Sequence, residues 1–277
     1  MKRTLTLAAL GLLLLAGTAC SQQILGAAAQ DRVEKTLPLA AGGSFSLQNV
    51  NGDLTVALGK EGEVHLVAEK KVKALDQERA QKALAQLEVA IDAKPSAVSV
   101  ETRYPKFEGL FGGTGFSVSV AYTVEVPPGT QVRLETVNGT VRVDAPGSRV
   151  SCETTNGSVR VGGAALLKAV TVNGKIEFQA ENVEEVSSTN GSVEGTVVTA
   201  RPSSGKVETV NGSVTLKLPS GSAVRIEAEN VNGSIQSGFP ALKGSKHSMS
   251  GDLNGGGQTL SIETVNGSIH VEPAGSV

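Results

Sequence analysis

The chain has 277 residues, of which 33 are Gly, 2 are Tyr and none is Trp, and its formal net charge is −2. This length fits one or two domains, and the weakly acidic balance disfavours a nucleic-acid partner. The glycine content favours a fold with many tight turns.

Residues 1–19 are typical of a lipoprotein signal peptide. A basic start at Lys2 and Arg3 precedes an apolar run from Leu5 to Ala16, which is shorter than the roughly 20 apolar residues of a spanning helix. The small residues before Cys20 resemble a bacterial lipobox, although Gly17 stands where a lipobox usually carries Leu. This resemblance implies cleavage before Cys20 and attachment of a lipid to its sulfur. The alternative is an ordinary signal peptide with an unrelated cysteine.

The lipobox implies a partner and a location. The membrane would hold the chain through lipidated Cys20, followed by a tether over residues 20–35. We expect an exported protein of the cell envelope, at the outer membrane or cell surface rather than the inner membrane. A lipidated Cys20 leaves Cys152 without a disulfide partner, and Cys152 lies in an apolar column, where we expect a buried thiol.

Residues 36–129 are expected to form a β-rich cap with one helix at about 74–86. Asp76 is the expected N-cap, and the apolar stripe of the helix would contain Leu75, Ala80, Ala83, Leu84 and Leu87. A hairpin is predicted over 89–100 and a long strand over 116–126. The Gly-rich stretch 104–115 carries Phe107, Leu110 and Phe111, which would form either a contact patch or a cover over one end of the fold.

Residues 130–277 repeat one phrase, which reads Thr-Val-Asn-Gly-Ser-Val in its clearest copy at 209–214. Its Asn-Gly pairs recur every 17 to 21 residues, apart from a last gap of 34 residues in which we expect one hidden copy. We expect each pair to be a sharp turn built from two residues that tolerate positive φ. The turn residues of this region are Asn138, Gly139, Asn156, Gly157, Asn173, Gly174, Asn190, Gly191, Asn211, Gly212, Asn232, Gly233, Asn266 and Gly267. A further copy stands alone at Asn51-Gly52.

Apolar residues stand at fixed offsets from each Asn. The positions three and five residues after it are mostly apolar and enclose a polar residue, which is the period-two pattern of a half-buried strand. The position four residues before it forms another apolar column, so each unit should contain two short strands. The sequence therefore predicts an all-β fold, a single parallel β-solenoid of right-handed sense, in which identical Asn side chains stack as an amide ladder.

At this point the chain resembles the bacterial family of unknown function DUF4097, whose members are labelled as adhesins by inference. The resemblance covers about residues 36–272 and rests on the order of the cap elements, the strand that ends in Val-Pro-Pro-Gly at 126–129, and the serial Asn-Gly units. It implies a β-solenoid in a secreted or envelope-anchored protein. It offers no catalytic residues and no cofactor.

The polar residue enclosed after each turn forms an outward column, and this column is the candidate binding face. Its charged members are Arg142, Arg160, Glu177 and Glu194. An enzyme of the polysaccharide-cleaving kind would need carboxylates converging on a groove, whereas Arg160 beside Glu177 is more simply a cross-strand ion pair. We therefore expect no catalytic residues.

A second outward column, three residues before each Asn, is acidic. Neighbouring basic residues could neutralise it, and Arg133, Lys168, Lys206 and Arg225 lie near enough in sequence. A calcium ion is the alternative, but Gly255-Gly256-Gly257 lacks the Asp of a calcium-binding repeat, and the 3 His are dispersed, so we expect no metal. The column consists of Glu135, Glu153, Glu208, Glu229 and Glu263.

The leading functional hypothesis is a non-enzymatic envelope lipoprotein that presents a repetitive surface to a polysaccharide, a matrix component or an envelope protein. The first alternative is a periplasmic accessory module for protein binding or signalling. The second is a polysaccharide-active enzyme. Two interruptions of the period, at 197–204 and 238–257, are expected to be loops that could also carry binding.

Overall fold

The computed structural model describes residues 26–104 and 116–275. The predicted signal peptide, the lipidation site Cys20 and the apolar residues Phe107, Leu110 and Phe111 lie outside these ranges. The all-β prediction is confirmed, because strands dominate the described residues and only α1 (Gln77–Gln86) is helical there. No helix in this part of the chain is both long and apolar enough to cross a membrane.

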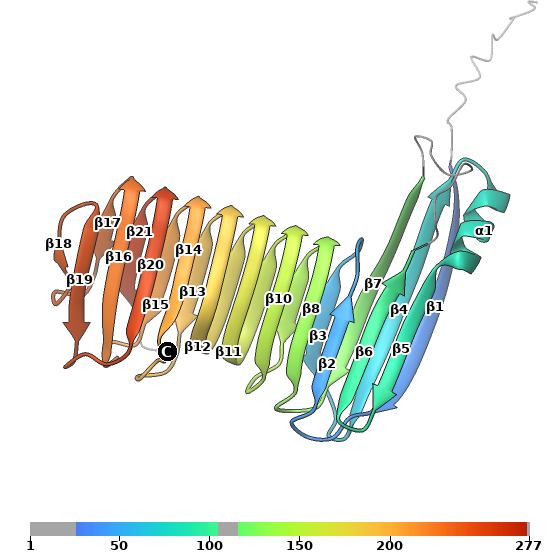
Figure 1. The fold of residues 1–277 in the computed structure, drawn as a ribbon, viewed down its shortest axis with the longest axis horizontal. Coiled ribbons are helices and arrows are strands. Elements are labelled where there is room, and N and C mark those ends of the chain that lie inside the picture. Colours follow the sequence, from blue (N-terminus) through green and yellow to red (C-terminus); the bar gives the residue numbers. More distant parts are fainter. Residues whose placement is uncertain (1–25, 105–115, 276–277) are drawn as a thin grey trace, which may run out of the picture.

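Two layers of strands form an elongated stack, with an Asn-Gly turn joining the layers in each repeat unit (Figure 1). The pre-turn layer holds the strands before these turns, namely β2 (Ser44–Gln48), β8 (Gln131–Asn138), β10 (Arg149–Asn156), β14 (Gly205–Asn211), β20 (Thr259–Asn266) and β16 (Val224–Asn232). The post-turn layer holds β3 (Leu54–Leu58), β9 (Val141–Asp144), β13 (Val193–Val197), β15 (Val214–Leu218), β21 (Ile269–Pro273) and β17 (Ile235–Ser237).

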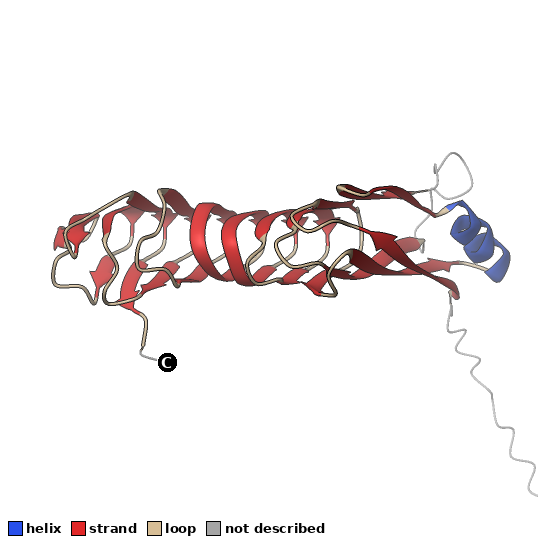
Figure 2. Ribbon diagram, turned by 90° about the horizontal axis from the view of Figure 1, so that it is seen from below, coloured by secondary structure: helices blue, strands red, loops and turns tan. Residues whose placement is uncertain are grey.

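Two strands pass through both layers. β11 (Val159–Asn173) and β12 (Ile176–Asn190) begin in the post-turn layer and bend into the pre-turn layer, and they are the broad curved ribbons at the centre of Figure 2. Their continuity joins all 21 described strands into one hydrogen-bonded sheet. Here the expected two short strands per unit become one long strand, and in β11 the change of layer coincides with a register shift at Gly162 and Gly163.

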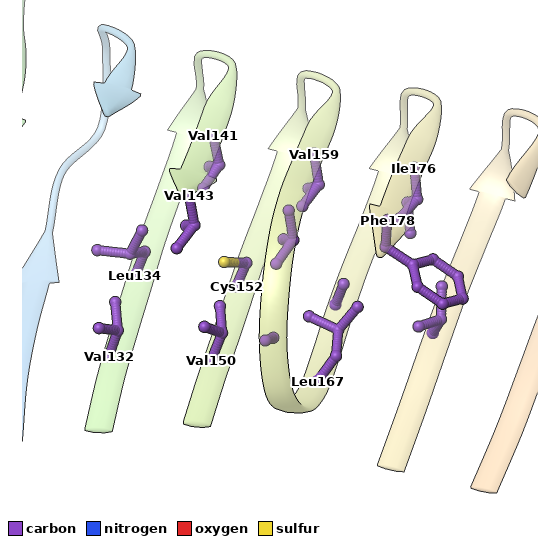
Figure 3. Close-up of a cluster of buried hydrophobic side chains, with 14 of the residues drawn as sticks. Val132, Leu134, Val141, Val143, Val150, Cys152, Val159, Leu167, Ile176 and Phe178 are labelled. Atoms are coloured by element: carbon purple, nitrogen blue, oxygen red, sulfur yellow. The ribbon is translucent and has the colours of Figure 1, made fainter. Parts of the chain in front are cut away.

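Neighbouring units pair in parallel and in register. Asn156 of β10, for example, pairs with Asn138 of β8 on one side and with Asn173 of β11 on the other. Register is fixed because a shift of one residue would turn each apolar set outward. The predicted apolar columns are accordingly buried between the layers, as Figure 3 shows for Leu134, Cys152 and Ile176, each 0% exposed.

The turn glycines correct one expectation. Of the repeat-turn glycines, only Gly52 and Gly233 have positive φ, and the only described non-Gly residue with positive φ is Asn254, whose Asn-Gly turn lies outside the repeat units. Glycine is instead required by close approach: a Cβ on Gly157 would come within 3.0 Å of the carbonyl oxygen of Gly139 in the next unit. The same collision recurs at each turn, so the stacking itself selects glycine.

The spatial order of the units differs from their order in the sequence. The isolated copy at Asn51 belongs to the stack, since β2 and β3 pair with β8 and β9. No hidden copy fills the last gap. Instead, β20 and β21 lie between the units of β14–β15 and β16–β17, so Asn266 stands between Asn211 and Asn232.

The N-terminal end of the stack is covered by the cap. In the pre-turn layer β6 (Ala97–Arg103) pairs with β2 and with β5 (Glu88–Lys94), while in the post-turn layer β7 (Ser117–Val126) pairs with β3 and with β4 (Glu63–Ala74). β1 (Ala27–Pro38) completes the post-turn side against β4. The predicted tether over 20–35 is therefore wrong from Ala27 onward. β1 is an edge strand with charged, mostly exposed residues, and so it lacks the apolar alternation that would have identified it.

The helix was predicted with the right cap but too early a start. Asp76 is the N-cap, because its side chain accepts a hydrogen bond of 2.8 Å from the backbone N–H of Arg79. Ala74 is the last residue of β4, and Leu75 is 53% exposed rather than part of the apolar stripe. Ala80, Ala83 and Leu87 make the buried contacts.

At the C-terminal end, the interruption at 238–257 covers the last unit of the stack. It forms β18 (Lys243–Gly244) and β19 (Ser248–Leu253), and β19 pairs antiparallel with the outer edge of β16. Phe239, Leu242 and Leu253 are buried beneath it. An antiparallel strand ends the parallel stack, so the outer edge of β16 is no longer open for pairing.

Candidate functional site

A long groove of about 1040 Å³ lies on the outer surface of the post-turn layer. Its lining extends from Thr55 on β3 to Glu272 on β21, across neighbouring strands of the stack. All four residues of the predicted binding face line it: Arg142, Arg160, Glu177 and Glu194. The structure therefore brings these four side chains into one groove, on consecutive strands.

Parallel register sets the order of the side chains. Residues four positions after a turn Asn form the first groove column, which runs Thr55, Arg142, Arg160, Glu177, Glu194 and Thr215; Gln236 and His270 continue the column beyond the groove lining. The residues two positions further form the second groove column, which runs Ala57, Asp144, Gly162, Gln179, Thr196, Lys217 and Glu272. Successive members of a column are about 4.8 Å apart, since this is the spacing of hydrogen-bonded strands.

The centre of the groove is a charge-neutral network of ion pairs. The guanidinium Nε of Arg160 lies 2.7 Å from Oε2 of Glu177. The ammonium of Lys175 lies 2.8 Å from Glu177 and 2.9 Å from Glu194. Lys175, and then Arg160, lowers the pKa of Glu177, and the two glutamates raise the pKa of Lys175. These residues therefore keep their charges and satisfy one another at neutral pH.

Arg142 is different. Its neighbours in the first groove column are Thr55 and Arg160, and it makes no ion pair with any residue that the structure describes. Arg160 already forms an ion pair with Glu177, so Arg142 is the unpaired cation among the described residues at this end of the groove. Near the other end, Lys217 also makes no ion pair with a described residue, although Glu272 is its partner on the next strand. Both can donate several hydrogen bonds to a ligand.

The second groove column provides room rather than charge at three of its positions. Ala57 and Thr196 have small side chains and Gly162 has none. The described lining contains no exposed aromatic side chain, because Phe178 is only 6% exposed and points inward. The groove can thus offer hydrogen bonds and charge along its length, but no aromatic platform.

Lys175 is the member of the ion-pair network that sequence reasoning missed. It directly follows Asn173-Gly174, a position where the other units carry Asp, Thr or Ser. A second hollow of about 220 Å³ lies against it, between Thr140, Arg142 and Arg160. A Lys at a position where every other unit has a small polar residue was the sequence signal that could have identified it.

The acidic column lies on the outer surface of the pre-turn layer and is partly neutralised by ion pairs. Arg133 binds Glu135 at 2.7 Å, and Lys206 binds Glu208 at 2.7 Å and Glu263 at 3.2 Å. The other two expected partners bind elsewhere: Lys168 pairs with Glu185 at 3.0 Å, and Arg225 pairs with Glu227 and Asp252. These four basic residues were assigned from sequence distance, which does not give strand position.

The described residues contain no group of three His, Cys, Asp or Glu side chains that could hold a metal ion. His65 contacts Glu34 at 3.0 Å in the cap, and His247 contacts Asn230 at 2.8 Å at the far end. Cys152 is fully buried, which raises the pKa of its thiol to about 12 and keeps it protonated at physiological pH.

No family model matches the chain, so the resemblance to DUF4097 stays a prediction from the repeat pattern. No curated protein matches it either. Among solved structures, a proposed cell adhesion protein from Clostridium sporogenes is 15% identical with a TM-score of 0.37, covering 88% of this chain and 100% of the other. Proposed adhesins from Bacteroides fragilis and Parabacteroides merdae are 12% and 11% identical, with TM-scores of 0.38 and 0.40, and cover 88% of this chain and 97% and 96% of their own. At these scores the similarities assign no function.

Proposed function

We propose that this protein is a non-enzymatic binding module of the cell envelope, built as a β-solenoid that holds an extended polar ligand in the groove of the post-turn layer. The observation that carries the proposal is the groove itself. It extends along the stack, and its side chains repeat at one fixed spacing. A compact ligand would use only a small part of such a surface.

Arg142 and Lys217 allow the groove to bind a ligand with separated anionic groups, although each has a groove carboxylate beside it, Asp144 and Glu272 respectively. Arg142 and Lys217 are free to bind such groups, while the central network of Arg160, Lys175, Glu177 and Glu194 is internally satisfied. The two free cations lie four strands apart along the stack, or about 19 Å at the spacing of parallel strands. An acidic polysaccharide or an acidic extended segment of an envelope protein would present anionic groups at such separations.

The binding test uses arrays of linear polysaccharides and of acidic peptides, probed with the purified protein and with a groove variant, Arg142→Ala/Lys217→Ala. We expect the variant to lose at least tenfold in affinity for any ligand that the native protein binds. The matched control is Arg149→Ala/Lys243→Ala, which removes the same charge from exposed positions outside the groove. Equal affinity of the native protein and the groove variant would contradict the assignment of the site.

Residues 1–20 favour a lipid-anchored location, and the side of the membrane separates the two leading functions. Added protease should digest residues 130–277 on intact cells if the protein is an adhesin-like surface module. Protection until the outer membrane is opened would instead support the alternative, a periplasmic accessory module that binds a protein. Cys20→Ala is the control for anchoring, since this variant should lose membrane association.

A further inference from the structure

The last repeat unit along the chain is not the last unit of the stack. Residues 259–273, which form β20 and β21, lie between the unit of β14–β15 and the unit of β16–β17. This inserted unit is held on both sides, and its four apolar core residues are at most 1% exposed. These residues are Leu260, Ile262, Ile269 and Val271.

The chain reaches this position by crossing over β16. β19 pairs with one edge of β16 and β20 pairs with the other, so residues 254–258 must span two strand spacings, or about 9.6 Å. On the way they wrap around the start of β16, where the backbone N–H of Arg225 donates to the carbonyl oxygen of Gln258 at 3.0 Å. The described chain enters the inserted unit through this short crossing.

The crossing is a constrained hinge. Asn254, Gly255 and Gly256 have φ values of 47°, 92° and 76°, and Asn254 is the only described non-Gly residue with positive φ. The Asn254 side chain donates hydrogen bonds of 3.0 and 2.9 Å to the carbonyl oxygens of Ser220 and Ser222. Short, strained hinges favour exchange of the connected segment between molecules, because exchange lets the hinge extend.

The inserted unit pairs with its two neighbours through the same repeat pattern as every other unit. Asn266 meets its neighbours in the same register that every other unit uses, with amide hydrogen bonds of 2.8 Å to Asn211 and 2.9 Å from Asn232. If the unit is withdrawn, β14, β15, β16 and β17 each lose a partner along one edge. Unpaired strand edges bind further strands, and the segment with the right register and apolar faces is residues 259–273 itself.

We propose that this position is an acceptor for residues 259–273 of a second copy of the chain, so that two molecules associate by exchanging their C-terminal units. The partner is a second copy because only its segment reproduces the buried side chains and the ion pair of Glu263 with Lys206, which measures 3.2 Å. Exchange forms the contacts of the inserted unit again, gives up the hydrogen bonds of Asn254 with Ser220 and Ser222, and releases the strain of the hinge. This inference is independent of the ligand of the groove.

A disulfide reports which chain supplies the inserted unit. Glu208 and Glu263 are direct partners across β14 and β20, so their Cα atoms are about 4.8 Å apart. The double variant Glu208→Cys/Glu263→Cys therefore places two cysteines at a Cα separation that suits a disulfide. The matched control is Glu135→Cys/Glu153→Cys in the same column, between units that are consecutive in the chain. Both pairs are made in a full-length background with Cys20→Ser and Cys152→Ala, refolded at low and at high protein concentration, and then oxidised.

We expect a covalent dimer for the 208/263 pair that rises at least fivefold with concentration, while the 135/153 pair stays monomeric. Deleting Gly255 and Gly256 should make the dimer the main species, and inserting Gly-Ser beside them should reduce it. Monomers from both pairs at high concentration, or equal dimer yields from both, would overturn the proposal. The hinge variants alter no core residue. Their oligomeric state in solution, monomer or dimer, therefore provides a second readout if a cysteine variant fails to fold.

Discussion

At the residue scale, the turns are held by two side-chain ladders. The amide of each turn Asn donates to the side-chain oxygen of a neighbouring Asn, at 2.8 to 2.9 Å, along the whole stack. Two residues earlier, a buried hydroxyl donates to a turn-glycine carbonyl of the next unit, as from Thr209 to Gly191 at 2.8 Å and from Thr171 to Gly157 at 3.0 Å. The Asn ladder was predicted from the repeat. The hydroxyl ladder was not, although a Thr or Ser recurs at that position.

Loss of one rung of the Asn ladder should destabilise the fold measurably. Asn211→Ala removes the hydrogen bonds to Asn190 and from Asn266, both 2.8 Å. We expect a loss of about 1–2 kcal/mol in the free energy of unfolding, seen as a lower urea midpoint. Val210→Thr is the control, because Thr189 already occupies that exposed column, and its stability should stay within about 0.5 kcal/mol of the native value. An unchanged midpoint for Asn211→Ala would show that the ladder adds no stability.

The two tyrosines give a pH test without mutation. Burial raises the pKa of Tyr104, and it raises the pKa of Tyr122 to about 12, where the phenol also bonds Thr102 at 2.7 Å. The folded state therefore prefers the neutral phenol. The resulting stability is complete below the unfolded pKa of about 10 and is lost as the pH rises toward 12. Since the chain has 2 Tyr and no Trp, absorbance at 295 nm reports only these groups, and a native titration centred near 10 would contradict the burial.

At the element scale, the sequence predicted those features that depend on local pattern. Asp76 identified the helix N-cap, and the alternation around Asn138 or Asn211 identified strands, because capping and period-two burial act over a few residues. β1 was missed because an edge strand needs no apolar alternation. The position of β20 was missed because every unit carries the same phrase, so register permits several orders and only the covering hairpin of β18 and β19 decides among them.

Packing between β12 and β13 explains one interruption of the apolar column that lies five residues after each turn Asn. Where other units carry Val161 or Leu216, β13 has Gly195, and the ring of Phe178 on β12 fills the vacant space. A Cβ at Gly195 would come within 3.0 Å of three atoms of this ring. Gly195→Ala should therefore cost about 1–3 kcal/mol of stability by overpacking.

The rescue variant makes this prediction specific. Adding Phe178→Leu to Gly195→Ala should recover most of the loss, since the smaller side chain leaves room for the new methyl group. Urea unfolding of the two single variants and the double variant gives the coupling between the sites. Additive effects of the two substitutions would mean that the ring and the glycine do not share the space.

At the scale of the whole molecule, the stack is closed at both ends and open along its sides. The cap covers the N-terminal end and the hairpin of β18 and β19 covers the C-terminal end, so the long surfaces are left for contact (Figure 1). One of them carries the groove. The first groove column was predicted because it depends only on the repeat. The second groove column and Lys175 depend on how strands bend around the layers, which periodicity does not encode.

The central claim is that the groove of the post-turn layer is the binding surface. Hydroxyl-radical footprinting of the native protein, with and without envelope fragments of its own host, tests this claim even while the ligand is unidentified. We predict protection of Arg142, Lys217 and Glu272 along the groove, and unchanged labelling of Glu135 and Val210 on the pre-turn layer. Protection confined to the pre-turn layer, or no protection at saturating fragments, would contradict the account.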